Sequence, residues 1–422
     1  MPIEAHIFRG INIINQKKII ILLLFFFSFF EILFSQDLGI KQNIINDLIN
    51  TGFENIRIKY DPDEIIIAYE NRVYRFDVDG LREVLKIVVP KLTEQKKIIL
   101  IPENRKIPLV IIETAVTDCR DYLSSNISGS KFAEKLNIKL KTDSEWQVLK
   151  NETEFNSSNL RFDITLRPTI AAEFGVYTDP VLWQLNLVPG IKTGFWKGMN
   201  INYELIVPIH NDLSPKEDSV RTGLAVINQT YRLPNSYFLS TSAGYFSNNR
   251  YGFDLELRKY LSNGDINFGL NFGITSYASF AGNKFYYSDI FIWTGSLSAE
   301  FRMPEYDLTL GLTLGKFLMG DNSIRFDINR EFGEIEIGFF AIRSNSGLSN
   351  GGINLSIPIF PSKYWKPDFL RVRTAEYFTW SYLVRGNTDD LIGLRYNTGS
   401  RLNVFMKKLI PSFIKNSFRN DY

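Results

Sequence analysis

Residues 266–274 read INFGLNFGI, a stretch in which large apolar residues alternate with small or polar ones. In a β-strand successive side chains point to opposite faces, so this alternation places every large apolar residue on one face. The same period recurs at residues 160–166, 199–207, 251–258 and 308–314. The stretch therefore predicts one strand of a long antiparallel sheet with an apolar face and a polar face.

Connection lengths distinguish the two architectures that such strands can build, a soluble sandwich and a transmembrane barrel. Barrels have short turns at one end and longer loops at the other. If the first strand begins at Leu160 and runs outward, the even-numbered connections are all short: residues 196–198, 233–236, 261–264, 303–305 and 332–334. The odd-numbered ones include longer loops at residues 210–219, 278–286 and 344–351, besides short ones near residues 247–249 and 319–322. This asymmetry favours a barrel.

Strand length points the same way. Strands of about 10 to 13 residues, at about 3.3 Å per residue and a tilt near 45°, cover the roughly 25 Å apolar band of an outer membrane. The regular strands end near Pro358, residues 359–369 are expected to form a connection or plug, and two less regular strands are expected at residues 371–384 and 391–405. We therefore expect an all-β transmembrane β-barrel of about 12 to 14 antiparallel strands at residues 160–405, with a helical tail at residues 406–422.

The N-terminus indicates export. Lys17 and Lys18 precede an apolar run at residues 19–34, which is short for a membrane-spanning helix and contains Glu31. This pattern predicts a signal peptide at residues 1–36; the alternative is an uncleaved N-terminal anchor. No cysteine follows the run closely enough for a lipoprotein.

Residues 37–125 mix the helical and strand periods and predict an N-terminal α/β domain, which we expect in the periplasm. Helices are expected at residues 40–49 and from Asp79, as N-cap, to residue 91. Strands are expected at residues 55–60, 64–69, 72–76, 97–101 and 109–113. Cys119 is expected to be a buried small apolar residue, and the polar stretch 126–159 is expected to be a linker.

Composition excludes several classes of function. Lys plus Arg total 48 and Asp plus Glu total 46, so no basic excess indicates a nucleic-acid partner. The two histidines and one cysteine leave little material for metal sites or catalytic triads, and no Gly-rich phosphate loop occurs. We expect no enzyme, no cofactor and no metal; the weak alternative is a hydrolase that uses His210 with Ser214 or Ser219.

Three motifs occur in order in the second half of the chain: GKFLMGD at residues 315–321, IRFDINREF at residues 324–332 and GINLSIP at residues 352–358. They resemble the YjbH-like family of Gram-negative outer-membrane proteins, which is tied to exopolysaccharide and group 4 capsule production. Residues 242–246 (SAGYF) and 69–75 (YENRVYR) are similar to a barrel hairpin and to the α/β module of the same family. The resemblance implies one outer-membrane barrel with a role connected to a surface polysaccharide.

We therefore expect a non-enzymatic outer-membrane barrel that assists export or surface anchoring of exopolysaccharide or capsule and docks to envelope partners through its periplasmic domain. The alternative is a general porin or an assembly scaffold unrelated to polysaccharide. Expected partners are outer-membrane lipid, a polysaccharide and export proteins. Tyr260, Tyr277 and Trp293 are candidate sugar platforms. The lumen-facing, polysaccharide-facing candidates are Asp254, Glu256, Arg258, Asp321, Arg325, Asp327 and Arg330.

Overall fold

A computed structural model describes residues 39–93, 96–174, 180–261, 263–281, 284–365, 368–384 and 391–420. The predicted signal peptide therefore lies outside the described residues. The chain forms two compact units, residues 1–47 and residues 48–422, and the sections below concern the second. The predicted first helix is confirmed and covers residues 39–51. No helix of the described residues is long and apolar enough to cross a membrane.

Residues 54–149 form the head, a six-stranded sheet of order β1-β2-β3-β5-β6, with β4 paired to β3, and its helices. The strands of this sheet are rich in apolar residues, and both faces of the sheet are buried. The largest buried side chains include Phe53 and Tyr69. The strands are β1 (Glu54–Tyr60), β2 (Glu64–Glu70), β3 (Lys97–Asn104), β4 (Ile107–Pro108), β5 (Ile111–Ala115) and β6 (Asn137–Lys139). The helices are α2 (Asp77–Val88), η1 (Val89–Lys91), α3 (Val116–Leu123), α4 (Gly129–Lys135) and α5 (Asp143–Leu149).

The head differs from the expectation in three places. Residues 72–76 form no strand with β2, because Tyr74 makes a bridge to Lys363, far along the chain. The helix α2 begins at Asp77, so Asp79 lies in its first turn and is not the N-cap. The expected linker at residues 126–159 instead contains α4, β6 and α5, which cover and extend the sheet.

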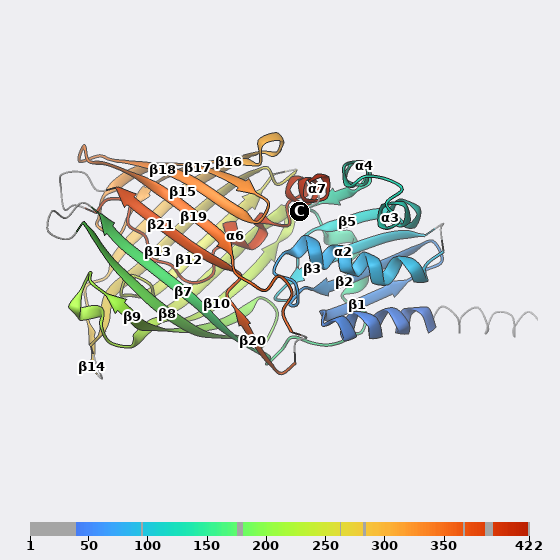
Figure 1. The fold of residues 1–422 in the computed structure, drawn as a ribbon, viewed down its shortest axis with the longest axis horizontal. Helices are drawn as coiled ribbons and strands as arrows, with labels where there is room; N and C mark the ends of the chain where they lie inside the picture. Colours follow the sequence, from blue (N-terminus) through green and yellow to red (C-terminus); the bar gives the residue numbers. More distant parts are fainter. Residues whose placement is uncertain are drawn as a thin grey trace, which may run out of the picture. The chain divides into compact units, whose positions relative to one another are not determined.

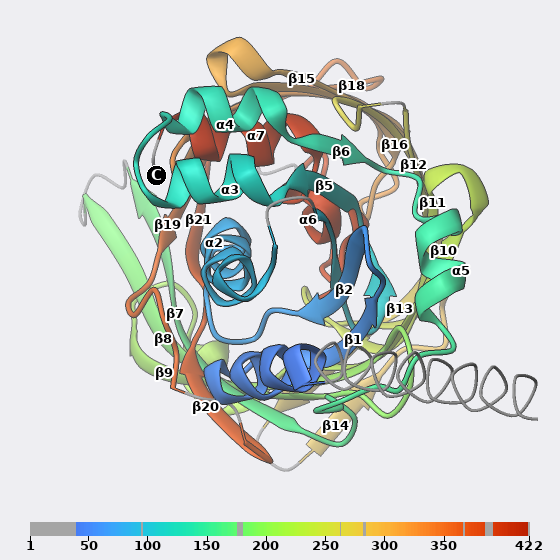
Figure 2. The same ribbon diagram turned by 90° about the vertical axis from the view of Figure 1, so that its right-hand side faces the viewer.

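The rest of the unit is one 15-stranded sheet, shown from two sides in Figures 1 and 2. Its hydrogen-bonded path runs β20-β7-β8-β9-β10-β11-β12-β13-β15-β16-β17-β18-β19-β21; β20 is parallel to β7 and the other pairs are antiparallel. The first strands are β7 (Phe162–Phe174), β8 (Val181–Thr193), β9 (Met199–Asn211), β10 (Arg221–Leu233), β11 (Tyr237–Phe246), β12 (Arg250–Tyr260) and β13 (Ile266–Ala281). The remaining strands are β14 (Lys284–Tyr287), β15 (Ile292–Met303), β16 (Leu308–Lys316), β17 (Asn322–Phe332), β18 (Ile335–Ser344), β19 (Ser349–Pro358), β20 (Leu370–Thr374) and β21 (Tyr377–Val384). Short 3₁₀ turns occur at η2 (Pro215–Glu217), η3 (Pro234–Ser236) and η4 (Pro304–Tyr306).

The predicted strands between residues 160 and 358 are confirmed in number and order, and the even-numbered connections are short as expected. The expected loop at residues 278–286 is wrong in part, because β13 continues to Ala281 and pairs with β14 as a hairpin. The first long strand, β7, and the last, β21, lie close together: the Phe174 and Tyr382 rings meet edge to face with centroids 5.4 Å apart. In the described residues no hydrogen-bonded ladder joins the two ends of the path.

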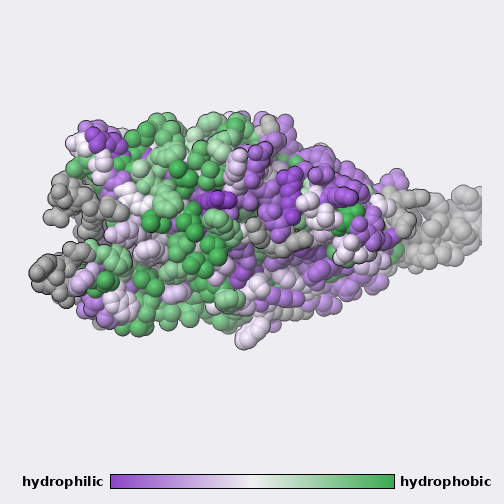
Figure 3. Space-filling model, turned by 45° about the horizontal axis from the view of Figure 1, so that its top comes forward, coloured by the Kyte–Doolittle hydropathy of each residue, from purple (hydrophilic) through white to green (hydrophobic). Residues whose placement is uncertain are grey.

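The two faces of the large sheet differ in chemistry. On β12, Phe253 is 43 % exposed, while its neighbour Asp254 is 3 % exposed. On β17, Ile324 and Phe326 are exposed on the face opposite to Arg325 and Asp327. Figure 3 shows the apolar residues gathered as a wide green area over the large sheet, whereas the head surface is mostly hydrophilic. The alternation of the sequence thus becomes an apolar outer face and a polar inner face, and we call the space on the inner side the lumen.

The chain after β19 departs most from the expectation. The strand expected at residues 371–384 is divided into β20 and β21, and the strand expected at residues 391–405 is absent. Residues 391–401 have no regular structure and lead into α6 (Leu402–Lys407) and α7 (Pro411–Arg419). The expected helical tail is thus confirmed, but the segment before it is not a wall strand.

Candidate functional site

The site begins with three charged side chains on the inner face of β12. Asp254, Glu256 and Arg258 occupy alternate positions and are each about nine-tenths buried or more. Asn271 on β13 donates to Asp254 at 3.0 Å, and Arg258 pairs with Glu300 at 3.4 Å. Buried charges need hydrogen-bond or ion-pair partners, because removing a charge from water costs free energy. The neighbouring strands supply only some of the partners of these three side chains.

The remaining partners come from residues 391–419, here called the C-terminal segment. The Tyr396 hydroxyl donates to Asp254 Oδ2 at 2.6 Å. The backbone N–H of Leu402 donates to Glu256 Oε2 at 3.0 Å, and the Tyr260 hydroxyl donates to the Leu402 carbonyl at 3.1 Å. The C-terminal segment therefore lies inside the lumen and completes the hydrogen bonding of β12.

One end of the C-terminal segment is held by two connections, residues 247–249 and 317–321. The N–H of Gly393 donates to Asp321 Oδ2 at 2.9 Å, and the N–H of Asn397 donates to Ser247 Oγ at 2.7 Å. The Tyr396 ring stacks on Phe246 with centroids 5.2 Å apart. These connections join β11 to β12 and β16 to β17, at the end of the sheet opposite to the short even-numbered turns.

The other end of the C-terminal segment lies against the head. Phe413 of α7 meets Phe76 edge to face, with centroids 5.8 Å apart, and Phe418 meets Phe132 at 5.2 Å. Lys407 forms an ion pair with Glu331 at 3.2 Å on the way. The C-terminal segment thus passes along the lumen from one end of the sheet to the head, as the red chain in Figures 1 and 2 shows.

Two arginines, the buried Arg371 and the half-buried Arg105, connect the head to the large sheet. Arg371 on β20 donates to Glu54 of the head at 2.6 Å and to Asp163 on β7 at 3.0 Å. Arg105, from the turn after β3, donates to Asn228 on β10 and to the Ser400 hydroxyl, both at 3.0 Å. Burial lowers the pKa of Arg105 to about 10, which still leaves it charged near neutral pH. Head, wall and C-terminal segment therefore share one polar network.

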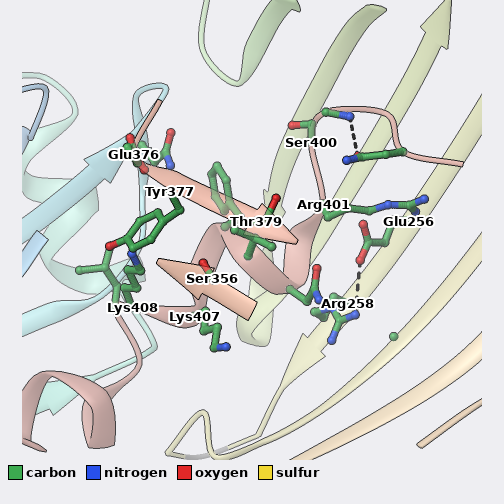
Figure 4. A pocket seen from close by; sticks show the side chains of 18 of the residues that line it. Glu256, Arg258, Ser356, Glu376, Tyr377, Thr379, Ser400, Arg401, Lys407 and Lys408 are labelled. Carbon is green, nitrogen blue, oxygen red and sulfur yellow. Dashed lines mark hydrogen bonds and ion pairs between the residues drawn. The ribbon is translucent and has the colours of Figure 1, made fainter. Parts of the chain in front are cut away.

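A cavity of about 1060 Å³ remains where these three parts meet. Figure 4 shows Ser356 of β19 and Thr379 of β21, two hydroxyl side chains, across from Arg401 and Glu256. The cavity is lined by hydroxyls, amides and paired charges, with aromatic rings such as Tyr377. Such a lining can exchange hydrogen bonds with a hydroxyl-rich ligand or with water. Among the described residues no group of three or more His, Cys, Asp or Glu side chains could hold a metal ion.

The predicted site residues lie in different places. Asp254, Glu256, Arg258, Arg325 and Asp327 are on the inner face, and Arg325 and Asp327 pair with each other at 2.6 Å. Asp321 lies in the β16–β17 connection and binds the C-terminal segment.

The placement of Arg330 in the lumen is wrong. Arg330 is exposed, in phase with the outward Phe326 and Ile328, and its guanidinium lies over the Phe332 ring at 4.9 Å. Of the candidate sugar platforms, Tyr260 faces the lumen, whereas Tyr277 and Trp293 are exposed.

His210 and its neighbours do not form a catalytic arrangement in the described residues. His210 pairs with Asp212 at 2.8 Å and stacks on Trp183, and no hydrogen bond joins it to Ser214 or Ser219.

The sequence reasoning missed Asn228, Tyr396, Arg401 and Leu402. Asn228 could have been found from the sequence, because its polar side chain follows Leu224 and Val226 on the same face of β10. The other three residues have no such local pattern.

The fold and this site define a class of protein: a large antiparallel sheet, apolar outside and polar inside, whose lumen holds the C-terminal end of its own chain. The family model described as Exopolysaccharide biosynthesis protein YbjH (YjbH) matches residues 34–375, and the chain belongs to this family. The family resemblance expected from the motifs is thereby confirmed. Comparison with curated proteins gives no significant match.

Two solved structures that match about half of the chain are an outer-membrane protein and a porin. A loop L8 deletion mutant of OmpT from Vibrio cholerae is 9 % identical and has a TM-score of 0.26; the match covers 46 % of this chain and 85 % of that one. A mutant porin of Rh. blastica is 12 % identical and has a TM-score of 0.27, with 47 % and 90 % covered. These scores are too low to carry an argument about function.

Proposed function

We propose that this protein is a non-enzymatic outer-membrane β-barrel that assists export or surface anchoring of an exopolysaccharide, with its head in the periplasm as a docking module for envelope partners. The observation that carries the proposal is the opposite character of the two faces of the large sheet. Exposed residues of the outer face, such as Phe253, Phe268 and Leu312, are stable in contact with lipid, whereas the buried charges of β12 need a polar interior.

Closure of the sheet into a barrel is part of this proposal. A sheet edge in lipid leaves backbone groups without hydrogen-bond partners, which costs several kcal/mol per group. The contact between Phe174 on β7 and Tyr382 on β21 supports closure between these two strands. The parallel strand β20 pairs with the first five residues of β7, from Phe162 to Leu166.

Connection length supports an orientation for the proposed barrel. Outer-membrane barrels have short turns on the periplasmic side. Short turns contact the head here: the N–H of Gly198 donates to the Arg105 carbonyl at 2.8 Å, and Arg75 forms a bidentate pair with Glu334 at 2.8 and 2.6 Å. The same side therefore holds the head, and we propose that this side is periplasmic.

The family and the lumen lining support a polysaccharide as the cargo or attached polymer. Deletion of the gene is expected to lower surface polysaccharide, and a plasmid with the intact gene is expected to restore it. Surface polysaccharide that stays at the parental level after deletion would refute the proposed function. Flotation of the protein with outer-membrane vesicles tests the location separately.

A general porin is the competing function. The C-terminal segment in the lumen disfavours a wide diffusion pore, because Tyr396, Arg401 and Leu402 lie where solutes would pass. A large, steady conductance of the purified protein in a planar bilayer would favour the porin instead.

A further inference from the structure

We propose that Asn228, Asp254 and Glu256 form a saccharide-binding wall in the lumen, and that residues 396–402 of the C-terminal segment occupy it until a saccharide chain displaces them. This inference rests on the proposed function and names how the lumen recognises its polymer. It also names the part of the C-terminal segment that moves.

The wall residues offer hydrogen-bond acceptors, and the C-terminal segment binds them with donors that resemble sugar hydroxyls. Asp254 accepts from a tyrosine hydroxyl, Glu256 accepts from a backbone N–H, and the Asn228 carbonyl oxygen accepts from the Ser400 hydroxyl at 3.2 Å. All three wall residues are more than nine-tenths buried. Sugar hydroxyls are donors of the same kind, so a saccharide can replace each hydrogen bond that displacement removes.

The head end of the C-terminal segment is held by apolar contacts. Ile414 and Phe418 of α7 are fully buried, and Phe418 lies among Tyr122, Phe132 and the Arg82 guanidinium, whose carbon lies 5.1 Å from the ring centre. Release of this end would expose these side chains to water, and no sugar hydroxyl could compensate for that loss. The helix α7 therefore stays in place.

The opposite end is held by hydrogen bonds and by apolar contacts. Gly393 binds Asp321, the N–H of Leu318 donates to the Leu394 carbonyl at 3.1 Å, and Asn248 donates to the Arg395 carbonyl at 2.6 Å. Water can replace such bonds with a small net change in free energy. Water cannot replace the apolar contacts: Ile392 is buried with Phe340 and Ile342, and Leu394 packs against the cluster that contains Phe246 and Leu318, so these two residues hold the far end of the segment in place. Residues 396–402 lie between this anchor and α7 and are the part that moves; the main apolar contact that they lose is the stack of Tyr396 on Phe246.

A glycine beside the wall makes room for Tyr396 in the position that it occupies in the structure. A side chain at Gly273 on β13 would overlap the Tyr396 hydroxyl, so the glycine allows that hydroxyl to reach Asp254. The cavity on the other side of the segment, lined by Ser356 and Thr379, gives the displaced residues a place to go.

Thiol labelling tests the proposal in the purified full-length protein. Thr398→Cys places a reporter at a position that is 1 % exposed, and Val404→Cys is the matched control on the same segment, at 69 % exposed. The native Cys119 is fully buried and does not compete. We expect slow reaction of Thr398→Cys with a water-soluble maleimide, and faster reaction when maltohexaose, the probe saccharide, is added. The rate for Val404→Cys should not change.

A second variant tests the role of the tyrosine hydroxyl. Tyr396→Phe keeps the stack on Phe246 and removes only the donor to Asp254, so we expect labelling of Thr398→Cys to accelerate about ten-fold. The proposal is overturned if maltohexaose leaves the labelling rate of Thr398→Cys unchanged or lowers it, or if Tyr396→Phe has no effect. Neither readout depends on polymer output in cells, so these failures are distinct from an unchanged polysaccharide level after gene deletion, which would refute the proposed function.

Discussion

Replacement of Arg371 by methionine should destabilise the protein strongly, because this residue joins the head to the large sheet. Its guanidinium binds Glu54, which is fully buried, and Asp163, which is 4 % exposed. Removal of one partner from a buried charge network costs about 3–5 kcal/mol. Each carboxylate keeps a second guanidinium, since Arg161 lies 2.8 Å from Glu54 and Arg373 lies 3.5 Å from Asp163. We therefore expect the lower end, a loss of about 3 kcal/mol in the free energy of unfolding.

The assay is urea denaturation of the detergent-solubilised protein, followed by tryptophan fluorescence. The matched control is Arg330→Gln, which removes an exposed guanidinium from the outer face and should change stability by less than about 0.5 kcal/mol. A loss below about 1 kcal/mol for Arg371→Met would contradict the reasoning.

Three further predictions concern single residues. Burial raises the pKa of the Cys119 thiol to about 12, so the folded protein should not react with a maleimide at pH 8 and should react once unfolded in urea. Burial raises the pKa of Glu103 to about 8, against the attraction of Arg57; the head should therefore be most stable below about pH 4.5 on account of this group and lose that contribution as the pH rises through about 8. Glu103→Gln should flatten this part of the pH dependence, as measured by denaturation at each pH. Gly273→Ala should destabilise the protein by about 1–3 kcal/mol, because the new methyl group overlaps the Tyr396 hydroxyl; an unchanged midpoint of denaturation would contradict this.

The head shows where secondary structure cannot be predicted from local sequence patterns. A turn at residues 70–71 predicts the second strand of a hairpin at residues 72–76, but Tyr74 pairs with Lys363, a partner that no local window contains. The polar composition of residues 126–159 predicts a linker, because such composition is typical of linkers. These residues nonetheless form α4 and α5, since Phe132 and Leu149 supply enough apolar contact to bury them.

Arg330 shows a different kind of error. Its position, two residues after Ile328 and four after Phe326, already placed it on the outer face, but its charge suggested the lumen. The alternation of period two was the better guide, because a side chain cannot change face without a bulge in the strand. A long arginine at the rim of an apolar face can extend its charge toward water.

The sequence by itself determined the wall of this protein. A period of two, strand length and turn length are local properties, and they were sufficient for the order of the strands, the two faces and the inward charges of β12. Only the tertiary structure decided what fills the lumen. Tyr396 and Asp254 are 142 residues apart, as are Leu402 and Tyr260, and their pairing depends on the curvature of the whole sheet and on the anchoring of α7 against the head. Contacts between residues so far apart leave no periodic pattern in the sequence. Each partner would fit the pattern of its own segment equally well if it formed its hydrogen bond with water instead.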